Sequence, residues 1–122
     1  MKKILIIDDD RMMLNALTTL LETEDYTSIT AIDGESGIAL YREQHPDAVL
    51  LDLRLPAKTG IEVLKEIRRI NAQAKVIIIT GFPSPEVREE SMKNGAFAFY
   101  EKSKDIGELL QALQKAFETS AS

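Results

Sequence analysis

Chemically useful side chains follow four of the short apolar runs in this sequence. They are Asp8-Asp9-Asp10, Asp52, Thr80 and Lys102. Each alone has an ordinary structural explanation, because aspartate or threonine after a strand often caps a helix, and lysine near a strand end is usually solvated. If the runs are parallel strands of one sheet, their carboxyl ends share one edge and bring all four groups together. The combination therefore predicts a charged site at that edge.

The carboxylates of this group predict a site for a hard cation. Two like charges about 4 Å apart repel by roughly 4 kcal/mol at an effective dielectric constant of about 20, so the group must protonate, separate or bind a counter-charge. Mg²⁺, which prefers octahedral oxygen coordination, and the ammonium group of Lys102 are the natural counter-charges. The chain has no cysteine for a thiolate site, and His45, in a loop away from this edge, is expected to be structural or exposed.

Five short apolar runs alternate with longer segments of helical period. Three of the runs are apolar at consecutive positions, as in strands whose two faces are both covered by helices. The expected strands are Ile4–Ile7, Ile29–Ile32, Ala48–Leu51, Val76–Ile79 and Phe97–Tyr100. This alternation predicts an α/β fold, a (βα)5 doubly wound parallel five-stranded sheet of flavodoxin-like strand order 2-1-3-4-5.

Polar residues mark where the helices should begin. The expected caps are Asp10, Asp33, Thr59, Ser84 and Asp105. Thr59 has Glu62 three residues later, which is the capping-box pattern, and Ser84 is followed by a proline at the first helical position. These signals place one helix after each strand.

The expected helix over residues 85–94 is unusually polar. Val87 and Met92 are its only sizeable apolar anchors, which predicts a loosely held element with a low free energy of local opening. A polar surface helix at an edge of the sheet explains the same composition equally well.

Length and charge limit the domain number and the class of partner. We expect one domain over residues 1–118, with the small polar residues 119–122 as a tail or the start of a linker. The net charge of −5, without a basic cluster, predicts no direct binding of nucleic acid. No apolar run approaches the length of a membrane span or signal sequence, so we expect a cytoplasmic protein that does not bind membranes.

In its motifs the chain resembles the receiver domains of two-component response regulators over nearly its whole length. The segments that carry the resemblance are Ile4–Asp9, Val49–Pro56 with Gly60, Ile77–Gly81, and Gly95-Ala96 with Phe99 and Lys102. The resemblance implies that Asp52 is the phospho-acceptor. It also implies that Asp8, Asp9, Asp52 and the backbone carbonyl of Arg54 hold Mg²⁺ or Mn²⁺, whereas Asp10 remains a helix cap.

The resemblance implies a signalling phosphoacceptor, which catalyses only its own phosphoryl transfer and dephosphorylation. Lys102 and the metal neutralise the phosphoryl oxygens, and the Thr80 hydroxyl donates to one of them. The donor is a sensor histidine kinase, a phosphotransfer protein or a small phosphodonor. Thr80 and Phe99 then switch the surface of the fourth helix, fifth strand and fifth helix, which controls an output domain or partner. An effector domain beyond Ser122 and dimer formation on activation are both compatible with this interpretation.

Three features depart from or vary the family pattern. Ser103 stands where the family commonly has proline, so the resemblance leaves the geometry of the loop around Lys102 undefined. Arg54 and Phe82, each two residues beyond a site residue, occupy positions that modulate the lifetime of the phosphoryl group, and we expect the bulky Phe82 to hinder the hydrolytic water. Phe99 lacks a hydroxyl, so a switch state fixed by a tyrosine hydroxyl bond is excluded at that position, although Tyr100 lies next to it.

Three alternative functions stay open at this point. The pair Asp8-x-Asp10 resembles the nucleophile and acid/base pair of haloacid dehalogenase phosphatases, but that family has threonine or valine where this chain has Arg11. A flavin carrier of similar fold is disfavoured because no phosphate-binding loop rich in Ser, Thr or Gly follows the first strand. A pseudo-receiver, which acts only as an interaction module, would keep the fold without phosphorylation.

Overall fold

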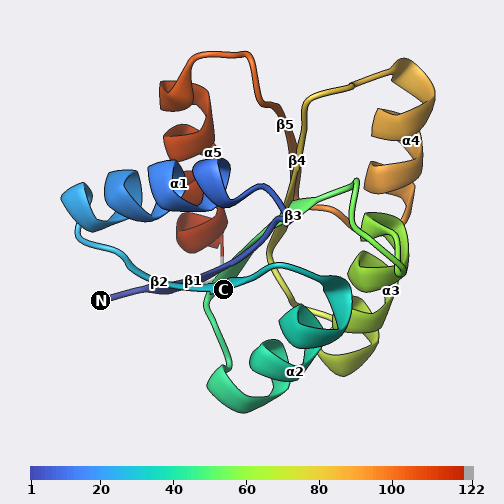
Figure 1. Ribbon diagram of the computed structural model, residues 1–122, viewed down its shortest axis with the longest axis horizontal. Coiled ribbons are helices and arrows are strands. Elements are labelled where there is room, and N and C mark those ends of the chain that lie inside the picture. The colour runs from blue at the N-terminus through green and yellow to red at the C-terminus, as the bar shows by residue number, and fades with distance from the viewer. Residues whose placement is uncertain (120–122) are drawn as a thin grey trace.

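The computed structural model describes residues 1–119 and has a parallel sheet of five strands, with one helix after each strand (Figure 1). The strands are β1 (Lys3–Ile7), β2 (Thr27–Ala31), β3 (Ala48–Asp52), β4 (Val76–Thr80) and β5 (Ala98–Glu101). The helices are α1 (Arg11–Thr23), α2 (Gly34–Gln44), α3 (Gly60–Ile70), α4 (Pro85–Lys93) and α5 (Ile106–Thr119). The strand order β2-β1-β3-β4-β5 confirms the predicted fold class.

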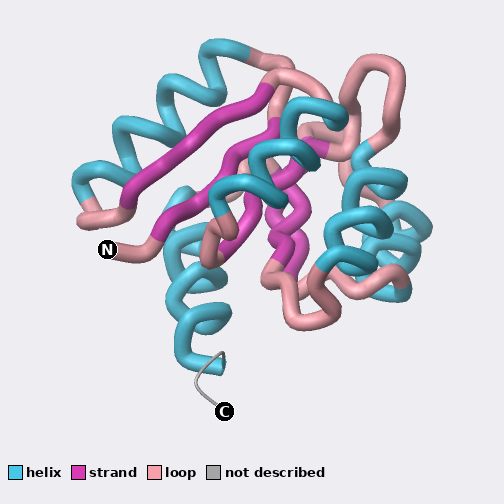
Figure 2. The backbone as a smooth tube through the Cα atoms, turned by 90° about the horizontal axis from the view of Figure 1, so that it is seen from below, coloured by secondary structure: helices cyan, strands magenta, loops and turns pink. Residues whose placement is uncertain are grey.

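Helices cover both faces of the sheet (Figures 1 and 2), and the side chains of β1 alternate between the two layers. Ile4 and Ile6 pack with α1 and α5, whereas Leu5 and Ile7 pack with α2 and α3. Because both faces are covered, β3 and β4 are buried along their whole length. This explains why the runs are apolar at consecutive positions rather than alternating.

The outer strands differ from the prediction in their bounds. β2 begins at Thr27 and ends before Ile32, whose side chain is 40% exposed, and β5 is shifted by one residue. At an edge of the sheet, polar residues can pair with a neighbour while their side chains face water. Thr27 therefore pairs with Lys3, although the apolar pattern began only at Ile29.

The predicted helix caps are confirmed. The Asp10, Asp33 and Ser84 side chains each accept hydrogen bonds from backbone N–H groups of the first helical turn. Thr59 and Glu62 form the reciprocal capping box. The Asp105 carboxylate accepts a hydrogen bond from the backbone N–H of Gly107 at 3.3 Å, at the start of α5.

Helix α4 is held even less by apolar burial than the sequence predicts. Ser91 is its buried residue, Val87 is half-buried, and the expected anchor Met92 is 41% exposed. Val87 and Ser91 are four residues apart and share the face toward the sheet, whereas Met92 is rotated away from it. The Ser91 hydroxyl donates to the Val87 carbonyl at 2.8 Å, which satisfies the buried oxygen.

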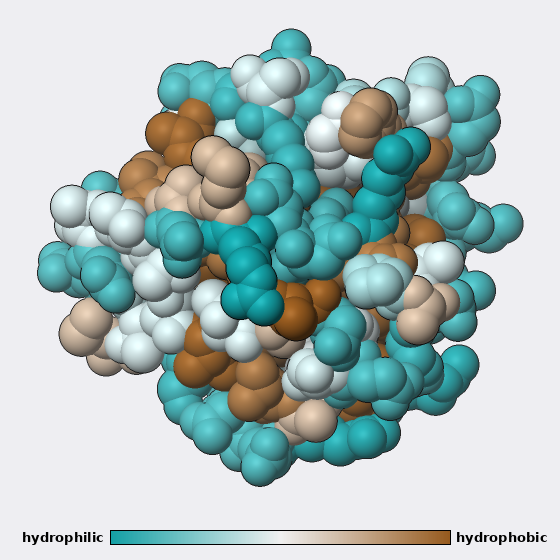
Figure 3. Space-filling view, in the orientation of Figure 1, coloured by the Kyte–Doolittle hydropathy of each residue, from teal (hydrophilic) through white to brown (hydrophobic). Residues whose placement is uncertain are grey.

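The predicted tail begins at Thr119, which is the last residue of α5, and its remaining residues 120–122 lie outside the described part of the chain. Among the helices in residues 1–119, none combines the length and the apolar character needed to cross a membrane. Figure 3 shows hydrophobic side chains in separate patches between hydrophilic ones on the face viewed.

The segment between β3 and α3 is closely packed against the end of β3. A Cβ atom at Gly60 would lie 2.5 Å from the Leu53 Cα and 2.6 Å from the Asp52 carbonyl oxygen, so only glycine fits there. Lys58 fastens the same loop, because its Nζ lies 2.6 Å from Glu66 Oε1 of α3 and 3.3 Å from Glu35 Oε1 of α2. The backbone that follows Asp52 is therefore held on two sides.

Ala57 has a left-handed backbone conformation in this loop. Its φ is 64°, and the Lys58 N–H donates to the Pro56 carbonyl at 2.8 Å, which closes a γ-turn around it. Residues with a Cβ atom are strained in this region of backbone space, and glycine is not.

We predict that Ala57→Gly stabilises the protein by roughly 0.5–1 kcal/mol, because relief of the strain exceeds the entropy that glycine adds to the unfolded chain. The control is Ala39→Gly at an exposed position inside α2, which should destabilise by about 1 kcal/mol. Urea unfolding of the three proteins measures both changes. A loss of stability in Ala57→Gly comparable to that of the control contradicts the assignment of strain.

Candidate functional site

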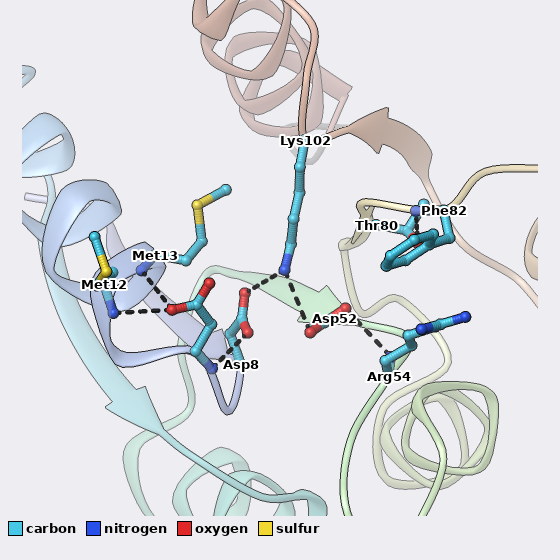
Figure 4. Close-up of polar contacts among 9 residues, drawn as sticks. Asp8, Met12, Met13, Asp52, Arg54, Thr80, Phe82 and Lys102 are labelled. Carbon is cyan, nitrogen blue, oxygen red and sulfur yellow. Dashed lines mark hydrogen bonds and ion pairs between the residues drawn. The ribbon is translucent and has the colours of Figure 1, made fainter.

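The predicted site residues meet at the carboxyl ends of the strands (Figure 4). Asp8 follows β1, Asp52 and Thr80 are the last residues of β3 and β4, and Lys102 follows β5. The register pairs Asp52 with Ile79, the residue before Thr80, so these two strands end almost level. The chain order and parallel pairing thus bring together four groups that are far apart in sequence.

Lys102 lies between the two buried carboxylates. Its Nζ is 3.0 Å from Asp8 Oδ2 and 3.4 Å from Asp52 Oδ2, and its backbone N–H donates to the Thr80 carbonyl at 2.8 Å. Burial alone lowers the pKa of Lys102, but the hydrogen bond to Asp8 and the charges of both aspartates outweigh burial and raise it. The group is therefore a fixed cation at any physiological pH.

One cation does not neutralise this cluster. Asp8 is fully buried and Asp52 is 4% exposed. Burial first, and then the charge of Asp8, raise the pKa of Asp52 to about 6, although the backbone N–H of Arg54 donates to its Oδ1 at 3.2 Å and opposes the rise. The site thus holds a carboxylate that is costly to ionise, which is the condition that favours binding of a further positive charge.

The acidic group fits a hard divalent cation. Asp8, Asp9 and Asp52 each offer one carboxylate oxygen, and these oxygens lie within 4.8 Å of one another. Asp8 Oδ2 is buried and, apart from its ion pair with Lys102, has no hydrogen-bond partner among residues 1–119, while exposed Asp9 leaves the group open to solvent. A buried acceptor of this kind beside an all-oxygen donor set suits Mg²⁺ or Mn²⁺.

Thr80 and Phe82 border the pocket on the side of β4. The Thr80 side chain is buried, and its Oγ1 accepts a hydrogen bond from the Phe82 backbone N–H at 3.1 Å. The Phe82 ring is 65% exposed and stacks on Arg54, whose Cζ lies 4.0 Å from the ring centroid (Figure 4). The sequence indicated both positions separately but gave no sign of this cation–π contact.

Phe99 lies on β5, away from the carboxylates, and is half-buried. The Arg88 guanidinium of α4 lies over its ring, with its Cζ 5.5 Å from the ring centroid. His45 is exposed and ends α2 with a φ of 47°, as expected for a structural or exposed residue.

The loop after Lys102 closes without proline. No cis peptide bond occurs among residues 1–119, and the Ser103 hydroxyl donates to the Glu101 carboxylate at 2.5 Å. The sequence interpretation considered Tyr100 only as the neighbour of Phe99 and missed its bond to this loop: the Tyr100 residue is 5% exposed, and its hydroxyl donates to the Lys104 carbonyl at 2.7 Å. Its position two residues before Lys102 was the available signal, because alternate residues of a strand point to the same side.

The chain is similar to known proteins over nearly its whole length. The family model of the response regulator receiver domain matches residues 4–114. Sporulation initiation phosphotransferase F of Bacillus subtilis is 33% identical over 114 residues, which cover 93% of this chain and 92% of that protein. The regulatory protein AtoC of Escherichia coli is 33% identical over 116 residues, which cover 95% of this chain but 25% of that protein. The chain thus spans about a quarter of the length of AtoC.

A solved structure that includes Mg²⁺ has the same fold. It is the crystal structure of the CheX-CheY-BeF3-Mg complex from Borrelia burgdorferi, with a TM-score of 0.90 and 29% sequence identity. The match covers 95% of this chain and 89% of that one.

We predict that Asp52→Asn stabilises the metal-free protein at pH 7. The pKa of Asp52 is about 6 in the folded protein against 3.8 for the free group, so the folded state binds the proton more strongly. The contribution of Asp52 to stability therefore falls as the pH rises from about 4 to about 6. Removing the charge should raise the free energy of unfolding by about 1–3 kcal/mol at pH 7, with little gain near pH 4.

Urea unfolding with a chelator at both pH values measures this effect, and Asp25→Asn, at an exposed aspartate after α1, is the control. Saturating Mg²⁺ should remove the gain, because only the wild type keeps all three carboxylates for the ion. An Asp52→Asn protein that is less stable than wild type in the chelator at pH 7 contradicts the prediction.

Proposed function

The chain belongs to the response regulator receiver domain family, and from this we propose that it accepts a phosphoryl group on Asp52 in a histidine-to-aspartate signalling pathway. The observation that supports Asp52 most directly is the position of Lys102 between it and Asp8 in a buried acidic pocket. We assign residues 1–118 to the receiver unit.

Each side chain of the pocket has a part in the proposed transfer. A carboxylate oxygen of Asp52 forms a bond to phosphorus as the bond from phosphorus to the donor breaks, and the electron pair leaves with the imidazole of a phosphohistidine or with acetate. Because the pKa of Asp52 is about 6, its carboxyl group is mostly ionised at neutral pH. Lys102 neutralises charge on the transferred group. Thr80 Oγ1 accepts from the Phe82 N–H, so its own hydrogen can be donated to a phosphoryl oxygen.

The proposed metal ligands are the carboxylates of Asp8, Asp9 and Asp52 with the backbone carbonyl of Arg54. Bound Mg²⁺ or Mn²⁺ supplies positive charge for the phosphoryl oxygens. The close packing of Gly60 against the residues that follow Asp52 fixes the backbone from which the Arg54 ligand comes. The CheX-CheY-BeF3-Mg complex of Borrelia burgdorferi supports the choice of Mg²⁺, because that complex contains the ion together with BeF3.

The proposed phosphodonor is a sensor histidine kinase or a phosphotransfer protein. We place the chain in the cytoplasm, without direct contact with nucleic acid or membrane. The chain covers 25% of AtoC, which is compatible with an effector domain in a longer parent chain. It covers 92% of sporulation initiation phosphotransferase F, which is compatible with a receiver that acts alone. Activation by dimer formation fits either arrangement.

Phosphorylation is proposed to act through Thr80 and Phe99 on the surface formed by α4, β5 and α5. Thr80 gains a new acceptor when the phosphoryl group arrives, which biases the backbone that leads into α4. Helix α4 is suited to move, because few of its side chains are buried. The contact of Arg88 with the Phe99 ring couples that helix to the aromatic side chain.

The contacts of Asp10 weigh against the phosphatase alternative. Its carboxylate accepts hydrogen bonds from the backbone N–H groups of Met12 at 3.0 Å and Met13 at 3.4 Å. A carboxylate engaged as the cap of α1 is poorly placed to act as an acid or base for a reaction at Asp8.

We predict a single phosphoryl adduct when the protein is incubated with acetyl phosphate and Mg²⁺, and no adduct without Mg²⁺ or in Asp52→Asn. Intact-mass spectrometry measures it, and Asp10→Asn is the matched control that should keep the adduct. Failure of the wild type to form any adduct, with acetyl phosphate or with a phosphorylated kinase, favours the pseudo-receiver. An adduct that still forms on the Asp52→Asn protein would identify Asp8 as the phospho-acceptor.

We predict that Phe82→Ala shortens the lifetime of the phosphorylated protein several-fold, because the stacked ring shields Asp52 from the attacking water. The measurement follows loss of the adduct by mass spectrometry after the donor is removed. Met12→Ala is the control, since Met12 is 82% exposed at the start of α1, on the other side of the pocket (Figure 4). Decay of Phe82→Ala at the wild-type rate rules out the shielding role.

A further inference from the structure

The turn that carries Lys102 has little intrinsic stiffness. Glu101 to Lys104 form a turn closed by the Lys104 N–H, which donates to the Glu101 carbonyl at 2.9 Å. No proline restricts it, and Ser103 and Lys104 are exposed. The bond between the Ser103 hydroxyl and the Glu101 carboxylate lies at the surface, where water competes for both groups.

The side chain of Tyr100 contacts this turn from the apolar layer under it. Tyr100 is 5% exposed, packs in the apolar layer with α1 and α5, and donates its hydroxyl hydrogen to the Lys104 carbonyl at 2.7 Å. The bond spans the turn, because Tyr100 precedes it and Lys104 ends it. Together with the bond from the Lys102 N–H to the Thr80 carbonyl, it fixes the backbone on both sides of Lys102.

The tyrosine hydroxyl remains a donor under all physiological conditions. Burial first, and then the charges of Glu108 and Asp105, raise the pKa of Tyr100 above its usual value. The contact therefore does not depend on pH near neutrality.

We propose that the Tyr100 hydroxyl is a positioning group for Lys102, which holds the turn so that the ammonium stays between Asp8 and Asp52. This inference rests on the proposed phosphorylation of Asp52. The long side chain of Lys102 has many rotamers, and a shift of its backbone would move Nζ away from the 3.0 Å and 3.4 Å contacts. A displacement of about 1 Å at such a group is enough to slow a transfer severely.

The decisive variant is Tyr100→Phe, which removes one oxygen atom and keeps the packed ring. The Lys104 carbonyl lies in an exposed residue, so water can replace the lost donor and the variant should fold. The rate of adduct formation with acetyl phosphate at saturating Mg²⁺ should fall about three- to tenfold. Affinity for Mn²⁺, measured by electron paramagnetic resonance, should not change, because the carboxylates are untouched.

Tyr41→Phe is the matched control. Tyr41 is equally buried, and its hydroxyl accepts a hydrogen bond from Asn71 Nδ2 at 3.1 Å, between α2 and the end of α3. This variant should phosphorylate at the wild-type rate. Replacing Tyr100 with 4-aminophenylalanine restores a donor at the same place and should restore the rate.

A Lys102→Ala background separates positioning from a general structural effect. If the hydroxyl acts through Lys102, Tyr100→Phe should cause no further slowing in that background, whereas an independent effect would multiply. A Tyr100→Phe protein as fast as wild type overturns the inference, as does further slowing without Lys102 or failure of the amino analogue to rescue. If the wild type itself takes no phosphoryl group, the proposed function fails instead.

Discussion

Two carboxylates, those of Asp8 and Asp52, are buried at the same edge of the sheet, with a single ammonium group between them. Burying either carboxylate requires a compensating positive charge, and Lys102 supplies only part of the charge that the pair needs. The sheet offsets the free-energy cost of these buried charges, because β1, β3 and β4 bury apolar side chains on both faces. Apolar burial between the sheet and its helices thus stabilises the fold, and the electrostatic cost is confined to the ends of the strands.

The surroundings of the pocket hold the charged groups in place from separate directions. Gly60 lets the start of α3 lie against the chain that follows Asp52, and Lys58 ties the same loop to α2 and α3. Lys102 is held through its own backbone and through the turn that follows it. By contrast, α4 and the exposed ring of Phe82 are only lightly held. The closely packed segments therefore carry Asp52 and Lys102, whereas α4 and Phe82, which have fewer buried contacts, border the pocket.

The fold could be predicted from the sequence because each strand and helix is specified locally. Consecutive apolar residues mark the buried strands, and Asp10, Asp33, Thr59 and Ser84 mark the helix starts. Grouping of the site residues followed from the parallel topology alone. Contacts between side chains from different elements, such as Arg54 with Phe82, could not be predicted, because they depend on rotamers. The exposure of Met92 depends likewise on the rotation of α4, and the left-handed Ala57 has no sequence signal, since alanine rarely adopts that conformation.

The outer strands of the sheet affect how the protein can meet other chains. β5 has four residues and ends at Glu101, and β2 exposes Thr27 and Thr30 beside its open edge. An edge strand that is short, as β5 is, or that carries exposed polar side chains, as β2 does, is a poor template for the strand of another molecule, which protects against edge-to-edge aggregation. Recognition by strand addition is thereby disfavoured. This leaves the side chains of the helices and of the loops around the pocket as the surface open to recognition.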